Sequence, residues 1–248
     1  MNPAGTVSVR RNEYGQPVGE PVPGWSPRPL PAGVTLKGDH CRLEPLDAYR
    51  HAAELHAAYG SGSDQRDWTY MFASPFESLD DYRRYAEAAA ASTDPRHYAV
   101  INLAGGTATG TLSLMRQDPD HGVVEVGNVM FSPAMKRRPI STEAQFLAMR
   151  YVFEDLGYRR YEWKCDSLNA PSRTTAERLG FTFEGIFRQA VVYKGRNRDT
   201  AWYSVTDTEW PTVKHGFEVW LSPDNFDDQA VQRRSLAELR AAAATAQP

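Results

Sequence analysis

A strand-like run followed by a basic loop and a helix start is the segment of this sequence best suited to chemistry. The loop and the first helical residues are Lys136, Arg137, Arg138, Pro139, Ile140, Ser141 and Thr142. Backbone N–H groups at a helix start lack partners and the helix dipole adds positive charge, so this end could bind phosphate. The three cations would add charge-assisted hydrogen bonds, and Ser141 could cap the helix or donate to a phosphate oxygen. On the residues alone, a solvated basic turn is the better explanation, because the sequence lacks a P-loop or GxGxxG motif.

Polar side chains near this loop are candidates for proton transfer. Glu125 lies in the strand-like run before the loop and is expected to share a sheet face with Gly127 and Val129. Burial would raise the pKa of Glu125 and make it a better base, although a strand glutamate paired with an arginine explains it equally well. Asn128, on the opposite face, could polarise a water or bond the neighbouring strand. Asp166, at the end of a later strand, is a second-choice base whose alternative role is to cap the next helix.

The composition limits the functions that these residues can serve. The chain of 248 residues holds 28 Lys and Arg against 31 Asp and Glu, a net charge of −3 that argues against a general nucleic-acid-binding protein. No apolar run is long enough for a transmembrane helix and no secretory signal opens the chain, so no membrane partner is expected. Two cysteines and six scattered histidines give no zinc spacing, so no metal is expected. Cys41 and Cys165 are expected to be buried, reduced thiols of a cytoplasmic protein.

Three regions are expected along the chain. Residues 1–35 are rich in proline, which favours an extended arm and opposes a helix. Residues 36–222 are expected to form the folded domain, and residues 223–248 a helical tail. Turn residues and hydrophobic periodicity predict strands at 36–46, 98–103, 108–116, 123–131, 160–166, 181–193 and 199–206, and helices at 48–59, 79–91, 142–156, 171–179 and 211–221. A mixed sheet with helices on its faces follows from this order.

The order of elements and several motifs resemble the GNAT superfamily of acyl-CoA-dependent N-acetyltransferases. The basic loop and its helix are followed by a strand, by Asn169-Ala170-Pro171-Ser172, and by a helix that ends in Leu179-Gly180-Phe181. The runs CRLEPL, VEVGNVMFSP, STEAQ, YRRYEWKCDSLNAPSR, RLGFTFEGIFRQ and KGRNRDTAWYSV resemble the branch of the ribosomal-protein acetyltransferases RimJ and RimL. The resemblance covers residues 36–209. It implies the GNAT fold, an α+β or α/β arrangement with a twisted, mostly antiparallel sheet, helices on both faces and a parallel strand pair that splays apart.

The resemblance also implies where acetyl-CoA, the expected co-substrate, would bind. It would lie in the gap between strands 123–131 and 160–166, with its pyrophosphate on the amides of residues 136–142. Its pantetheine arm would pair with the backbone of Met130 and Phe131. The remaining side chains implied for this site are Asn169 and Ser172, near the pantetheine and the thioester, and Arg173, toward a CoA phosphate.

The phosphate loop departs from the family pattern, which is Gln/Arg-x-x-Gly-x-Gly/Ala. Lys136 replaces the first residue, Pro139 the first glycine and Ser141 the small residue at the end. Proline has no N–H group, so one phosphate donor is lost. Its fixed φ angle suits a helix start, and the three cations would compensate for the lost donor.

The proton-handling residues also differ from those of relatives. The tyrosine acid of many family members corresponds to Ala176, and a carboxylate of RimL-like relatives corresponds to Val191. Ser172 is the best substitute for the tyrosine acid, as the resemblance to the RimL-like branch suggests. Glu125 is the candidate base, at an offset that resembles the base of histone-type members, and Asn128 could assist through a water.

Acceptor-binding residues are expected in two places. Trp68 and Tyr70 belong to an aromatic run in the loop between the first two helices, a region that shapes the acceptor pocket in relatives. A hydrophobic anchor for the loop explains them at least as well. Arg188 and Gln189 are expected near the opening of the same acceptor pocket. They could contact an acceptor carboxylate, or form a salt bridge on a strand face. Residues 194–198 are expected to form an exposed hairpin tip.

These features favour an N-acetyltransferase that transfers the acetyl group of acetyl-CoA to a primary amine by direct attack on the thioester. The amine could belong to a small molecule or to a protein N-terminus. Because two usual proton-handling residues and a loop glycine are missing, a GNAT-fold module that binds acyl-CoA or a partner without catalysis is the alternative. A third hypothesis is an RNA- or ribosome-associated modifier, which the acidic net charge supports little. The resemblance also suggests a homodimer, formed through the hairpin or the C-terminal helices.

Overall fold

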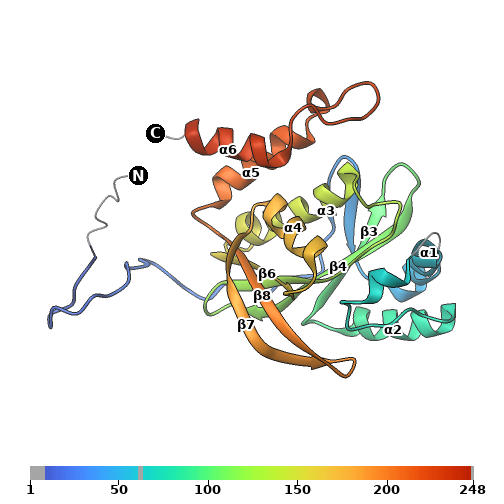
Figure 1. Ribbon diagram of the computed structural model, residues 1–248, viewed down its shortest axis with the longest axis horizontal. Helices are drawn as coiled ribbons and strands as arrows, with labels where there is room; N and C mark the ends of the chain where they lie inside the picture. The colour runs from blue at the N-terminus through green and yellow to red at the C-terminus, as the bar shows by residue number, and fades with distance from the viewer. Residues whose placement is uncertain (1–8, 61–63, 247–248) are drawn as a thin grey trace.

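One eight-stranded sheet organises the molecule in the computed structural model, which describes residues 9–60 and 64–246 (Figure 1). The strand order is β1-β2-β3-β4-β5-β6-β8-β7, and every neighbouring pair is antiparallel except β5 and β6. The strands are β1 (Leu36–Lys37), β2 (Cys41–Pro45), β3 (Arg96–Asn102), β4 (Thr107–Asp118), β5 (Val123–Phe131), β6 (Arg160–Asp166), β7 (Thr182–Tyr193) and β8 (Arg196–Thr206). This confirms the mixed, mostly antiparallel sheet expected from the sequence.

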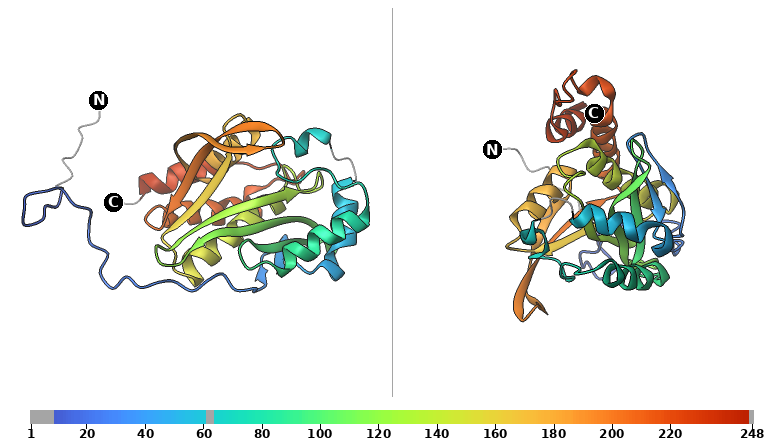
Figure 2. Two further views of the ribbon diagram at one scale, coloured as in Figure 1. Left: turned by 90° about the horizontal axis from the view of Figure 1, so that it is seen from below. Right: turned by 90° about the vertical axis from the view of Figure 1, so that its right-hand side faces the viewer.

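Helices cover both faces of this sheet and enclose two hydrophobic cores (Figure 2). The smaller core lies between the sheet and the helices α1 and α2, and the larger core lies beneath α3, α4 and α5. The helices are α1 (Ala48–Gly60), α2 (Leu79–Ala91), α3 (Pro139–Arg150), α4 (Ala170–Leu179), α5 (Trp210–Leu221) and α6 (Leu236–Ala246). Among the described residues, no helix combines the length and apolar character that a membrane crossing requires.

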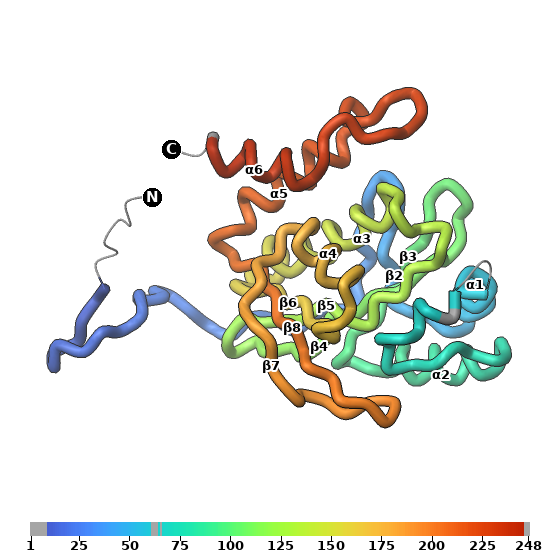
Figure 3. Tube along the Cα trace, in the orientation of Figure 1, coloured from blue at the N-terminus to red at the C-terminus, as the bar shows by residue number. Residues whose placement is uncertain are grey.

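The parallel strands β5 and β6 separate along their length, as expected. They pair from Val123 with Arg160 as far as Val126 with Trp163, and no pairing continues beyond that point although both strands do. A bulge deforms β5 there, since Asn128 has a φ of 49° and the register against β4 shifts. In Figure 3 the two strands lie side by side beneath α3 and α4, the helices that follow them in the chain.

The bulge corrects one prediction about the faces of β5. Strict alternation placed Val129 on the same face as Glu125 and Gly127. In the structure Val129 packs against the larger core with Val124 and Val126, while Met130 belongs to the smaller core. A bulge inserts one residue into the strand, so every later side chain moves to the other face.

Several element boundaries also differ from the prediction, and the single strand expected at 36–46 is divided into β1 and β2. The third helix begins at Pro139 rather than at residue 142, because proline suits the first helical position, and it continues as a π-helical turn at Tyr151–Asp155. The last hairpin turns at Lys194 and Gly195, whose φ angles are 48° and 69°, so β8 starts at Arg196 rather than at residue 199. A two-residue turn with two positive φ angles matches the twist of paired strands.

The described part of the N-terminal arm, residues 9–35, contacts the domain only in its second half. The indole N–H of Trp25 donates to the carbonyl of Asp120 at 2.8 Å, and the backbone N–H of Arg28 donates to the carbonyl of Pro119 at 2.9 Å. Residues 9–24 extend away from the body (Figures 1 and 2). At the other end of the chain, α6 packs against α5 and α4.

Candidate active site

A cavity of about 900 Å³ opens where β5 and β6 separate, and it continues along the face of β6 and β8 toward the last hairpin. Most side chains predicted for the site line it. They are Trp68, Tyr70, Glu125, Asn128, Met130, Phe131, Lys136, Arg137, Ser141, Thr142, Asn169 and Ser172. Six predicted residues do not line it, namely Arg138, Pro139, Ile140, Arg173, Arg188 and Gln189.

Glu125 is a buried carboxylate in the wall of this cavity, with 5% of its surface exposed. Its Oε2 atom lies 3.0 Å from Nζ of Lys164 and 3.2 Å from Nε of Arg116. Burial raises the pKa of Glu125 above its ordinary value, and the two cations oppose that shift only in part. The structure therefore combines both interpretations of the sequence, since this strand glutamate is buried and is also paired with an arginine.

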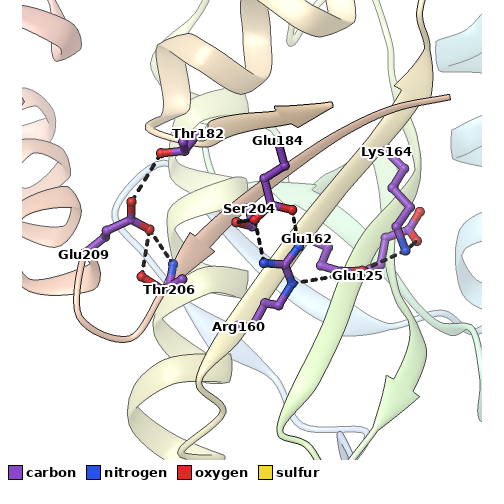
Figure 4. A network of polar contacts seen from close by, with 9 residues as sticks. All are labelled: Glu125, Arg160, Glu162, Lys164, Thr182, Glu184, Ser204, Thr206 and Glu209. Atoms are coloured by element: carbon purple, nitrogen blue, oxygen red, sulfur yellow. Dashed lines mark hydrogen bonds and ion pairs between the residues drawn. The ribbon is translucent and has the colours of Figure 1, made fainter. Parts of the chain in front are cut away.

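Alternating charges connect Glu125 to the far edge of the sheet (Figure 4). Lys164 also lies 2.7 Å from Glu162, and Arg160 lies 2.6 Å from the other oxygen of Glu162. Arg160 then donates twice to Glu184 on β7, at 2.7 and 2.5 Å. Lys164 and Glu162 were not among the site residues predicted from the sequence. The alternation of charges along β6 was visible in the sequence, but their pairing with Glu125 depends on the register of two strands far apart in the chain.

Asn128 lines the cavity and also links β5 to β4. Its side-chain amide donates to Oγ of Ser113 on β4 at 3.0 Å, which is one of the two roles expected for it. The backbone carbonyl of Met130 accepts a hydrogen bond from the hydroxyl of Tyr59 at 3.1 Å. Both contacts fix the deformed part of β5 at the cavity wall.

The start of α4 brings Asn169 and Ser172 to the opposite wall. The side-chain oxygen of Asn169 accepts from the backbone N–H of Ser172 at 3.2 Å and so caps the helix. The indole N–H of Trp163 donates to Oγ of Ser172 at 3.0 Å, so this hydroxyl keeps its own proton for donation. The thiol of Cys165 is a further neighbour of Ser172, and burial raises the pKa of that thiol.

Asp166, the second-choice base, has other partners. One of its oxygens accepts from the hydroxyl of Tyr193 at 2.8 Å, and the other accepts from the backbone N–H of Leu168 at 2.9 Å. The expected capping role is wrong, because Asn169 caps the next helix.

Buried polar groups without partners mark the end of the cavity near α3. The Oγ atom of Ser132 and both side-chain polar atoms of Gln145 have no hydrogen-bond partner among the described residues, although these residues are only 1% and 2% exposed. Both residues line the cavity. Leaving such groups unpaired is costly, so they fit a polar ligand such as the amide-bearing arm of acetyl-CoA.

Arg178 is the cation that the structure places beside the start of α3. Its Nη1 atom donates to Oγ1 of Thr142 at 3.1 Å, and its guanidinium lies 5.0 Å from the ring centre of Trp220 on α5. No carboxylate among the described residues pairs with it, and burial and the nearby Arg240 lower its pKa. Arg178 was not among the residues predicted from the sequence, because α4 brings it to the start of α3 only in three dimensions.

The predicted phosphate-binding cations are arranged differently from expectation. Lys136 pairs with Asp67 across the cavity mouth, at 2.6 Å. Arg138 precedes α3 without capping it through its side chain, and Ile140 packs into the larger core. Arg173 is directed to other partners, since it donates to the hydroxyl of Tyr203 at 3.0 Å and to the carbonyl of Ser167 at 3.3 Å.

The loop between α1 and α2 lies against the last hairpin. Trp68 is largely buried, with its ring edge-on to Phe76, as expected of a hydrophobic anchor. The ammonium group of Lys194 donates to the carbonyls of Trp68 and Ala73 at 2.8 and 2.9 Å, and Arg196 donates to the carbonyl of Thr69 at 2.7 Å. Residues 194–197 are exposed, as predicted for a hairpin tip, whereas Arg198 is buried and lines the cavity.

Arg188 and Gln189 occupy a separate hollow of about 680 Å³ on the hairpin. Gln189 has a φ of 51°, and its backbone N–H donates to Oδ1 of Asp199 at 2.7 Å. A bulge in β7 between Phe187 and Val191 turns these residues away from the main cavity, which alternation along the strand could not predict.

Within the described residues, no three His, Cys, Asp or Glu side chains gather as a metal site would require.

Comparisons with known proteins agree with this arrangement. A family model described as an acetyltransferase (GNAT) domain matches residues 40–182. The protein named "Putative ribosomal N-acetyltransferase YdaF" from Bacillus subtilis is 30% identical over 183 residues, which cover 69% of this chain and 92% of that protein. A solved GCN5-related N-acetyltransferase from Brucella melitensis is 48% identical, with a TM-score of 0.87, and covers 89% of this chain and 100% of its own. A probable GNAT-family acetyltransferase from Chromobacterium violaceum is 39% identical, with a TM-score of 0.73, and covers 79% of this chain and 98% of its own.

Proposed function

Because the chain belongs to the GNAT acetyltransferase family, we propose that it transfers the acetyl group of acetyl-CoA to a primary amine of a small molecule or a protein N-terminus. Acetyl-CoA supplies the acetyl group as a thioester. One observation carries the proposal, namely the single cavity that joins the start of α3 and Arg178 to the buried carboxylate of Glu125. The free, buried thiols of Cys41 and Cys165 support a cytoplasmic location.

The residues at one end of the cavity are suited to hold acetyl-CoA. The positive end of the α3 helix dipole and the unpaired charge of Arg178 would bind its phosphates. Gln145 and Ser132 would donate to or accept from the amides of the pantetheine arm. This set compensates for Pro139, which lacks the N–H group of the usual glycine, without requiring the side chains of Arg138 or Arg173.

The residues at the other end are suited to move protons. In the reaction the amine nitrogen forms a bond to the acyl carbon, and the bond from that carbon to sulfur breaks. Glu125 would accept the amine proton, directly or through a water, because its raised pKa makes it a stronger base than an ordinary glutamate. Ser172, which Trp163 orients, would donate a proton to the departing thiolate and regain one from water.

The name of the Bacillus subtilis relative suggests a ribosomal protein as acceptor for that protein. By analogy, a protein N-terminus is one of the acceptors that we propose for this chain. The resemblance to the RimJ and RimL branch supports the same choice.

The test is release of free CoA from acetyl-CoA in the presence of a panel of amines and peptides, followed with a thiol reagent. We expect release with at least one amine, and a fall in kcat of about 10²- to 10⁴-fold in Glu125→Gln, the range typical of a lost general base. Glu87→Gln, an exposed substitution on α2, is the matched control and should leave kcat unchanged. If the unmodified protein binds acetyl-CoA but releases no CoA with any amine, the non-catalytic binding module is the correct account.

A further inference from the structure

Arg198 is a buried cation without a hydrogen-bond or ion-pair partner in the described part of the chain. Only 8% of its surface is exposed, and it lines the main cavity at the end formed by the last hairpin. No hydrogen bond or ion pair joins its guanidinium to any residue that the structure describes, and its Nε atom is fully buried and unpaired. A buried charge is costly unless it is paired, so such a group indicates an anion that is supplied by a ligand.

The carboxylate of Asp166 on the neighbouring strand does not supply this anion. Asp166 lies beside Thr200 on the neighbouring strand, but its two oxygens accept from Tyr193 and from the backbone of Leu168. Thr200 is itself 5% exposed, lines the cavity, and has an Oγ1 atom without a hydrogen-bond partner among the described residues. Arg198 and Thr200 are two residues apart on β8, so their side chains share one face of the sheet.

Aromatic rings hold the guanidinium of Arg198 in place. It lies 5.3 Å from the ring centre of Phe72 and 5.8 Å from that of Tyr193, and these two rings lie 5.5 Å from each other. The hydrogen bonds of Lys194 and Arg196 to carbonyls of the loop between α1 and α2 hold this part of the hairpin in place. Packed beside both rings, the guanidinium keeps its fork of donors in a defined orientation at little further entropic cost on binding.

We propose that Arg198 and Thr200 bind a carboxylate of the acceptor, while the amine of the same molecule reaches Glu125. This inference rests on the proposed acetyl transfer and names the substrate class for it. Glu125 is the register partner of Glu162 on β6, and Glu162 is the register partner of Ser204 on β8. Ser204 is six residues from Arg198 along β8. At about 3.4 Å per strand residue these two positions are roughly 20 Å apart, which is too far for the single carbon between amine and carboxylate in a free α-amino acid. A peptide whose acidic group lies at least two residues beyond its reactive N-terminus fits this separation better, because the Arg198 and Glu125 side chains span part of it.

The test compares pairs of peptides that differ only in a carboxylate. Tetrapeptide amides carrying aspartate at the third or fourth position are compared with the matching asparagine peptides by CoA release, and free glutamate is compared with free glutamine. We expect a kcat/KM at least about tenfold higher for an acidic peptide than for its amide, and no such preference for free glutamate. A preference for free glutamate over free glutamine would contradict the assignment of a peptide acceptor. Equal rates within every pair would contradict the carboxylate-binding site.

Variants connect the preference to Arg198. Arg198→Met should remove the preference by raising KM for the acidic peptide much more than KM for the amide peptide. Arg188→Met, which alters a hairpin arginine outside the main cavity, should keep the preference. If Arg188→Met removes the preference and Arg198→Met does not, the assignment of the subsite is wrong.

Thermal unfolding separates this role from a structural one. Because Arg198 has no hydrogen-bond or ion-pair partner among the described residues, Arg198→Met should leave the Tm unchanged or raise it. A large fall in Tm with an unchanged peptide preference would show that Arg198 supports the fold rather than the acceptor. If no amine or peptide is acetylated at all, the proposed function fails, and this inference fails with it.

Discussion

The ammonium group of Lys164 lies 3.0 Å from the carboxylate of Glu125. Both side chains are buried between neighbouring strands, and Lys164 also pairs with Glu162 and lies over the ring of Trp202. Lys164 therefore favours the charged form of Glu125, while burial favours the neutral form and prevails. This balance places a carboxylate with a raised pKa at one end of the cavity.

The pH dependence of acetyl transfer should show this carboxylate. A base acts only when it is deprotonated, so kcat/KM should fall as the pH decreases through the pKa of Glu125, at a pH above the 4.5 of an ordinary glutamate. The measurement is kcat/KM against pH at saturating acetyl-CoA. An acidic limb that persists unchanged in Glu125→Gln would assign it to another group.

Lys164→Met should move that acidic limb to higher pH. The substitution removes the closest positive charge from Glu125, so its carboxyl will hold the proton more tightly. Lys214→Met is the matched control, because Lys214 pairs with Glu154 and Glu218 instead. If the profile of Lys164→Met matches that of the unmodified protein, Lys164 does not set the protonation of the base.

Arg178→Met should weaken the binding of acetyl-CoA by about 10- to 100-fold, because it removes a charge-assisted hydrogen bond to phosphate. The turnover at saturating acetyl-CoA should change little. Arg173→Met, at the position that the family resemblance favoured, should leave the Kd unaltered, since Arg173 bonds Tyr203 and Ser167. Calorimetry with both variants decides between the two arginines, and a weaker complex only in Arg173→Met would reverse the assignment.

Asp67→Asn should tighten the binding of acetyl-CoA about two- to fivefold. Asp67 holds Lys136 in a partly exposed ion pair at the cavity mouth, and such a pair is worth about 0.2–1 kcal/mol. Its removal frees the ammonium group for a phosphate. The measurement is the Kd at low and high salt, where the gain should diminish as salt increases. Weaker binding in the variant would show that Asp67 helps to hold the ligand.

The sequence predicted the order of strands and helices well because each element has a clear period or turn signal. The helix from Leu79 to Ala91 has the predicted bounds, and the strand from Val123 to Phe131 does too. The separation of β5 and β6 was expected only from the family resemblance, since no local sequence pattern indicates a gap between two strands.

The parts of the site that the sequence did not predict depend on single-residue irregularities and on long-range register. The bulge at Asn128 moves Val129 to the other face of β5, and the two-residue turn before Arg196 draws Arg198 into a paired strand. Arg178 and Lys164 become functional candidates only when another element is packed beside them. Alternation along one strand contains none of that information.

A crystal structure of the protein with acetyl-CoA tests the central claim most directly. We predict that the pantetheine arm lies between the separated ends of β5 and β6, with phosphate groups at the start of α3 beside Arg178 and the acetyl group toward Glu125. A complex in which the space between these strands is closed, or in which acetyl-CoA binds elsewhere or does not bind at millimolar concentration, would contradict the account.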